Sequence, residues 1–148
     1  MIPDEAACAF LAELRARLAA STDPGGEAMR LIASRFSHYK WVGIYRLQGD
    51  QLVLGPYVGP PPEHTQIAVG QGVCGTAIAL ERNQIVGDVR RLTNYLACSA
   101  TTRSEIVVLI RRGGQIIGQI DADADETGAF DESDEFLLTR VAELLPAD

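Results

Sequence analysis

The chain has 148 residues, 47% of them hydrophobic, which is enough for a single domain, residues 1–148, with a core of its own. The net charge of −7 argues against nucleic acid as a partner, because phosphate binding needs an excess of basic side chains. The sequence shows no basic, apolar leader and no stretch as long as a membrane span, and its three cysteines do not make a disulfide framework. We therefore expect a cytoplasmic protein with no membrane partner.

Two amphipathic helices are predicted at the start of the chain. Apolar residues recur at helical spacing over Asp4–Ala20 and again from about Glu27 to Phe36. The intervening Ser21-Thr-Asp-Pro-Gly-Gly predicts a break, because proline and paired glycines do not continue a helix. Cys8 lies among alanines in the first helix, where we expect it to be a small packing residue.

From Lys40 onward the apolar residues alternate as they do in strands. The stretches 41–47 and 51–57 predict a hairpin around Gln48-Gly49-Asp50. Cys74 lies between two glycines and is expected in a turn. The other elements expected in this region are, in order, a strand at 65–69, a short helix at 76–81, a strand at 84–86 and a long polar connection at 90–102.

The last third of the chain predicts a second hairpin and a closing helix. Strands at 105–111 and 115–121 flank Gly113-Gly114, and a helix runs from an N-cap at Asp131 to Leu145. Together the elements predict an α+β fold, a mostly antiparallel sheet of about six strands with helices packed on one face. The residues of the closing helix expected to face inward are Phe136, Leu137, Val141, Leu144 and Leu145.

The register of the second hairpin decides where Glu105 points. If Gly113-Gly114 is a regular two-residue loop, Glu105 falls opposite Ala122 and its side chain faces away from Asp121 and Asp123. A bulge or a longer loop shifts the parity by one residue and places Glu105 beside Asp123. We predict such an irregularity, because the three acids can form one site only if it is present.

The acids and thiols in this part of the chain suit a small-molecule site more than a hydrophobic core. Cys98 lies on the polar connection, near the arginines 90, 91 and 103, which can favour its thiolate. Asp121 and Asp123 are two residues apart in a strand, so they share a face, and such close like charges raise the pKa of one of them. That carboxyl could donate a proton. The alternatives are a solvated strand end for the aspartates and plain packing for Cys74.

Trp41 and Tyr45 are four residues apart in one predicted strand, so both rings lie on the same face. They could form an apolar wall for a small ligand. Packing in the core is an equally good interpretation from the sequence alone.

Three motifs carry a family resemblance: Gly70-Gln-Gly-Val-Cys-Gly-Thr-Ala, Ala97-Cys98, and Ser104-Glu-Ile-Val-Val. With the order of elements, they resemble a GAF domain and, within that class, the free methionine-(R)-sulfoxide reductases. The similarity runs from about Trp41 to Phe130. It implies an oxidoreductase active in oxidative stress, with a small-molecule substrate, no bound cofactor, an external thiol reductant (the thioredoxin or glutathione system) and a homodimeric state.

The resemblance also implies roles for particular residues. Cys98 matches the catalytic cysteine of the family, and its usual resolving cysteine is replaced here by His64. Either Cys74 or an external thiol would then clear the sulfenic acid formed on Cys98. The residues that match the substrate-binding aromatics and acids of the family are Trp41, Tyr45, Glu105, Asp121 and Asp123.

The replacement by His64 keeps a second function class open, a non-catalytic GAF sensory module that binds a small ligand. A purely structural role explains neither Cys98 nor the acids. No metal site is expected, because His64, Cys74 and Cys98 lack the paired spacing of metal ligands.

Overall fold

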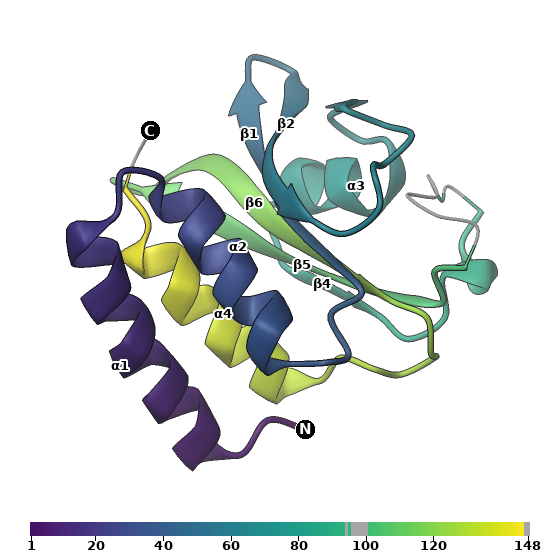
Figure 1. The fold of residues 1–148 in the computed structure, drawn as a ribbon. Coiled ribbons are helices and arrows are strands. Elements are labelled where there is room, and N and C mark those ends of the chain that lie inside the picture. The colour runs from purple at the N-terminus through teal and green to yellow at the C-terminus, as the bar shows by residue number, and fades with distance from the viewer. Residues whose placement is uncertain (94, 96–100, 147–148) are drawn as a thin grey trace.

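The structure, a computed structural model, describes residues 1–93, 95 and 101–146. Among these residues, six strands form one antiparallel sheet in the order β3-β2-β1-β6-β5-β4 (Figure 1). The predicted α+β fold is confirmed. The strands are β1 (Trp41–Gln48), β2 (Gln51–Val58), β3 (Gln66–Ala68), β4 (Gln84–Val86), β5 (Ser104–Arg112) and β6 (Gln115–Ala124).

Helices cover both faces of this sheet. The helices α1 (Asp4–Ala20), α2 (Pro24–Arg35) and α4 (Glu132–Leu144) pack on one face, and α3 (Gly72–Leu80) lies on the other (Figure 1). A short 3-10 helix, η1 (Val89–Arg91), follows β4. The prediction that the helices pack on one face was therefore wrong for α3. No helix in the described part of the chain is long and apolar enough to cross a membrane.

Alternation along the central strands divides the interior into two cores. In β5, for example, Ile106 and Val108 face α1, α2 and α4, whereas Val107 and Leu109 face α3. The core on the α3 side is the smaller one, and it contains Trp41, Tyr45, Leu52, Ile67, Val73, Cys74, Ala77, Ile78, Val107 and Leu109.

Several predicted helix boundaries and burials were wrong. Helix α2 begins at Pro24 rather than near Glu27, because the Asp23 side chain accepts a hydrogen bond from the Gly26 N–H and proline is tolerated in a first turn. Cys8 is exposed rather than packed. Phe136 is 56% exposed, since Leu137, Leu138, Val141 and Ala142 occupy the inner face of α4. The predicted N-cap at Asp131 is confirmed and forms a capping box with Asp134.

The predicted irregularity in the second hairpin is confirmed. Arg112 pairs with Gln115, as a two-residue loop requires, but the register shifts between Ile110 and Arg111. This bulge places Glu105 opposite Asp123. It also turns Glu105 toward the α3 side of the sheet, where the candidate site lies.

Candidate functional site

Three carboxylates gather on the α3 side of the central strands. Glu105 comes from β5, and Asp121 and Asp123 come from β6, two residues apart and therefore on the same face. Glu105 is 2% exposed, Asp121 0% and Asp123 2%. Acidic side chains are rarely buried without a partner, so this grouping indicates a binding site rather than a packing arrangement.

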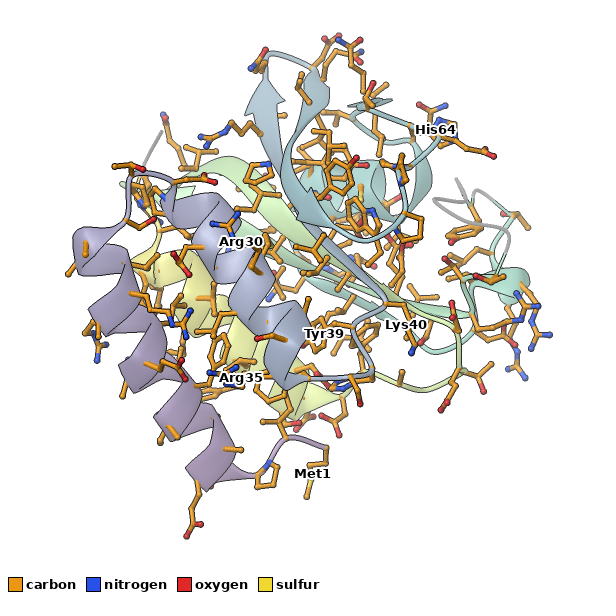
Figure 2. All side chains as sticks on the ribbon, in the orientation of Figure 1. Met1, Arg30, Arg35, Tyr39, Lys40 and His64 are labelled. Atoms are coloured by element: carbon orange, nitrogen blue, oxygen red, sulfur yellow. The ribbon has the colours of Figure 1, made fainter. Side chains whose placement is uncertain are left out.

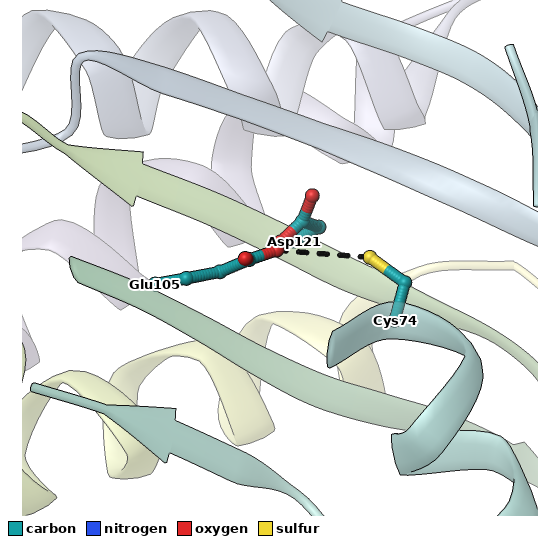
Figure 3. A group of neighbouring side chains, drawn as sticks. All are labelled: Cys74, Glu105 and Asp121. Atoms are coloured by element: carbon teal, nitrogen blue, oxygen red, sulfur yellow. Dashed lines mark hydrogen bonds between the residues drawn. The ribbon is translucent and has the colours of Figure 1, made fainter. Parts of the chain in front are cut away.

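Cys74 faces these acids from the first turn of α3. Its Sγ lies 3.8 Å from Oε2 of Glu105, and the ligand atoms of Cys74, Glu105 and Asp121 all lie within 4.8 Å of one another (Figure 3). The sequence predicted a turn at this position, but α3 begins at Gly72 and includes the cysteine. A Cβ on Gly75 would lie 2.4 Å from the Ala68 carbonyl oxygen, so a glycine is needed for α3 to pack this closely.

The electrostatics of this cluster favour protonated carboxyls. Burial, reinforced by repulsion from Asp121 and Asp123, raises the pKa of Glu105 well above its ordinary value. Burial also raises the pKa of Asp121. Oε1 of Glu105 and both carboxyl oxygens of Asp121 form no hydrogen bond of ordinary geometry among the described residues, although the Glu105, Asp121 and Cys74 side chains lie close enough to interact. These oxygens can accept hydrogen bonds from an ammonium group or a polar ligand at little further desolvation cost.

The aromatic residues Trp41 and Tyr45 border the cluster on β1. Trp41 pairs with Asp123 across the sheet, and its ring lies 6.3 Å from that of Tyr45, centroid to centroid. Tyr57 also stacks on Trp41, with 5.7 Å between ring centroids and an interplanar angle of 18°. The Tyr45 hydroxyl donates to the backbone carbonyl of His64 at 2.9 Å. Both rings therefore belong to the smaller core and also border the acids.

The structure brings most of the predicted site residues together: Trp41, Tyr45, Cys74, Glu105, Asp121 and Asp123. Cys98, the predicted catalytic residue, lies outside the described residues. Of the arginines expected near it, Arg90 forms a salt bridge with Asp88 at 2.9 Å.

Sequence reasoning missed Gln119 and the compactness of the acid–thiol cluster. The buried Gln119 amide donates to the Cys74 carbonyl oxygen at 3.0 Å, which ties β6 to α3. Strand alternation could have found it, because it precedes Asp121 by two residues on the same face. Histidine and cysteine spacing, on which no metal site was expected, does not reveal this group of one thiol and two carboxyls. The cluster is small enough to hold either a metal ion or an ammonium group.

Comparison with known families gives a clear match. The GAF domain family matches residues 25–145. The chain belongs to this family. This GAF domain is 43% identical over 109 residues to GAF domain-containing protein A of Dictyostelium discoideum, covering 73% of this chain and 68% of the relative.

Two reductases are also similar to this GAF domain. It is 41% identical over 115 residues to the free methionine-R-sulfoxide reductase of Escherichia coli (strain K12), covering 77% of this chain and 69% of the relative. The structure of free methionine-R-sulfoxide reductase from Neisseria meningitidis in complex with its substrate superimposes with a TM-score of 0.87 and 34% identity. That match covers 97% of this chain and 89% of the other.

Proposed function

We propose that this GAF domain is an oxidoreductase that reduces free methionine-(R)-sulfoxide to methionine, with thiols as the electron donors. The observation that carries the proposal is the cluster of buried acids beside Cys74 and Trp41 on one face of the sheet. Buried carboxyl oxygens that form no ordinary hydrogen bond, as on Glu105 and Asp121, are costly, so the cluster fits a ligand that brings a positive charge and hydrogen-bond donors. The similarity to two reductases supports this substrate class.

The acids divide into two roles by position. Glu105 lies beside the Cys74 thiol, and its raised pKa keeps a proton on the carboxyl at a pH where an ordinary glutamate is ionised. It is the proton donor for the departing sulfoxide oxygen. Asp123, next to Trp41, pairs with the ammonium group of the amino acid. Trp41 and Tyr45 form the apolar wall for the methyl and methylene groups.

The redox step requires Cys98. Its thiolate attacks the sulfoxide sulfur, the oxygen is transferred to Cys98 as a sulfenic acid, and methionine leaves. The Cys74 thiol then condenses with the sulfenic acid, which forms a disulfide and releases water. Thioredoxin or the glutathione system reduces that disulfide. In the other route, an external thiol attacks the sulfenic acid, which forms a mixed disulfide and releases water, and a second thiol then frees Cys98. Cys74 is a packing residue in this route.

An NADPH-coupled assay tests the proposal. With thioredoxin and its reductase, or with glutathione and glutaredoxin, we expect turnover of free methionine-(R)-sulfoxide and almost none of the S epimer. Peptide-bound methionine-(R)-sulfoxide should also react poorly, because its nitrogen carries no charge for Asp123 to pair and its chain does not fit a buried site. Equal rates on free and peptide-bound substrate would contradict the proposal.

Neutralising one acid gives a sharper version of the same test. Asp123→Asn should raise KM about ten- to hundredfold, since a charge-assisted hydrogen bond contributes roughly 1.5–3 kcal/mol. Glu126→Gln is the matched control, because Glu126 is exposed and follows the same strand. If the wild type binds the sulfoxide but none of the thiol reductants supports its reduction, the domain is a ligand-binding module without turnover.

A further inference from the structure

Lys40 is the only lysine in a chain with twelve arginines. It is exposed and immediately precedes β1, and Figure 2 labels it where the chain enters that strand. Its backbone N–H donates to the Asp123 carbonyl oxygen at 3.0 Å, which holds the Lys40 main chain against the end of β6. The fold therefore places a lone, flexible ammonium group at the edge of the acid cluster.

A pocket of about 180 Å³ lies at this edge. Its lining includes Asp123, which belongs to the acid cluster, Trp41, which borders the cluster, and Lys40. Within the described part of the chain, Lys40 forms no salt bridge, although Asp123 and Asp125 line the same pocket. One cationic and two acidic side chains around a small pocket are suited to a zwitterion.

The order of groups along β6 matches the order of groups along an amino acid. The Asp121 carboxylate lies with the Cys74 thiol and the Glu105 carboxylate, and Asp123, which pairs with Glu105 across the sheet, lies about 7 Å further along β6. A sulfoxide at the thiol end and an ammonium at Asp123 are separated by the short aliphatic chain of methionine. The α-carboxylate, bonded to the same carbon as the ammonium, then lies in the pocket that Lys40 lines.

We propose that Lys40 binds the α-carboxylate of the substrate and thereby selects free amino acids over their carboxyl-blocked derivatives. This inference rests on the proposed function, because it takes the ammonium at Asp123 and the sulfoxide near Cys74 as its starting point. Lys40 is a point charge on a flexible stem, so it can follow the carboxylate into the pocket without a fixed geometry.

The test compares two substrates, free methionine-(R)-sulfoxide and its primary amide, which keeps the ammonium but lacks the carboxylate. In the wild type we expect the KM of the amide to be about tenfold higher, as befits the loss of one partly exposed charge pair. Lys40→Met should raise KM about tenfold for the free acid, leave kcat nearly unchanged and have no effect on the amide. Lys40→Arg should restore most of the affinity, because it restores the charge.

Suppose that the wild type reduces the free acid, and that Lys40→Met either leaves the KM of the free acid unchanged or raises the KM of both substrates equally. The role assigned to Lys40 is then wrong, and the proposed function stands. If the wild type reduces neither substrate, the proposed function fails, and a binding measurement decides the role of Lys40. Reductive ¹³C-methylation keeps the lysine charge and gives one lysine NMR signal, identified by its absence in Lys40→Met.

Binding of methionine sulfoxide, followed by the fluorescence of Trp41, the only tryptophan, should move this lysine signal. The amide should bind without moving it. A free acid that binds and leaves the lysine signal in place overturns the inference. If neither the free acid nor the amide binds, both proposals are overturned.

Discussion

Burying Glu105 and Asp121 on one face of the sheet raises the pKa of both carboxyls, because each loses hydration as it charges. For Glu105 the charges of both aspartates add to this effect. Above its ordinary pKa of 4.5, the unfolded chain has released the Glu105 proton while the folded chain still holds it. The folded state then binds more protons, so its stability falls as pH rises toward the folded pKa.

The variant Glu105→Gln should remove the part of this dependence that comes from Glu105. We expect its free energy of unfolding to exceed that of the wild type at neutral and alkaline pH, with a difference that grows by up to about 1.4 kcal/mol per pH unit below the folded pKa. Urea unfolding at a series of pH values measures it. Glu63→Gln, a change at an exposed glutamate, should follow the wild-type curve. Parallel curves for Glu105→Gln and the wild type would show that Glu105 ionises normally.

At the scale of elements, the bulge in the second hairpin sets which face the acids occupy. Ile116 packs with the α3-side core and Ile117 with the other, and Gln119, three residues after Ile116, is again on the α3 side. Gly118 follows the bulge, where a Cβ would lie 2.5 Å from the Tyr45 carbonyl oxygen. β1 and β6 can approach this closely only because residue 118 has no side chain.

Gly118→Ala should therefore be costly. The Cβ meets backbone that cannot rotate away, so we expect a loss of roughly 1–3 kcal/mol in the free energy of unfolding. Gly87→Ala is the matched control, because a Cβ there meets nothing within 4 Å, and its effect should be within about 1 kcal/mol. Chemical denaturation of both variants measures the difference. Equal stability would mean that the bulge relaxes around the added methyl group.

The sequence predicted elements wherever one local pattern dominated. Helix α1 and strand β4 have the predicted bounds, and the hairpin irregularity followed from requiring Glu105 to join the aspartates. The start of α3 was missed because glycines on both sides of Cys74 weaken a helical pattern, and only packing against the sheet offsets that cost. The inner face of α4 was misjudged because Phe136 and Leu138 are both apolar, and tertiary contacts alone decide which is buried.

At the scale of the whole molecule, the thiols lie in different surroundings. Cys74 is buried on the α3 side of the sheet, whereas Cys8 is exposed on α1, which packs on the opposite face. The role of Cys98 stays a prediction from sequence. The separation of Cys8 from the acid cluster makes it a natural control for any redox event at the site.

Intact-protein mass spectrometry after one equivalent of substrate, without reductant, should find that the wild type has lost two hydrogens, as a Cys74–Cys98 disulfide requires. Cys74→Ser should instead gain one oxygen, or a mixed disulfide with added thiol. Cys98→Ser should not change, and Cys8→Ser should behave as the wild type. Full turnover of Cys74→Ser with glutathione would establish the external-thiol route. Substrate that binds while every thiol stays reduced would refute the enzyme proposal.

The two cores on opposite faces of the sheet have a consequence for how a buried site exchanges its ligand. Helix α3 covers the acids, whereas α1, α2 and α4 hold the central strands from the other side. The cover can open by local unfolding while the larger core keeps β1, β5 and β6 paired. We therefore expect amide hydrogens of α3 to exchange with solvent well before those of the central strands, and a ligand to enter and leave without global unfolding.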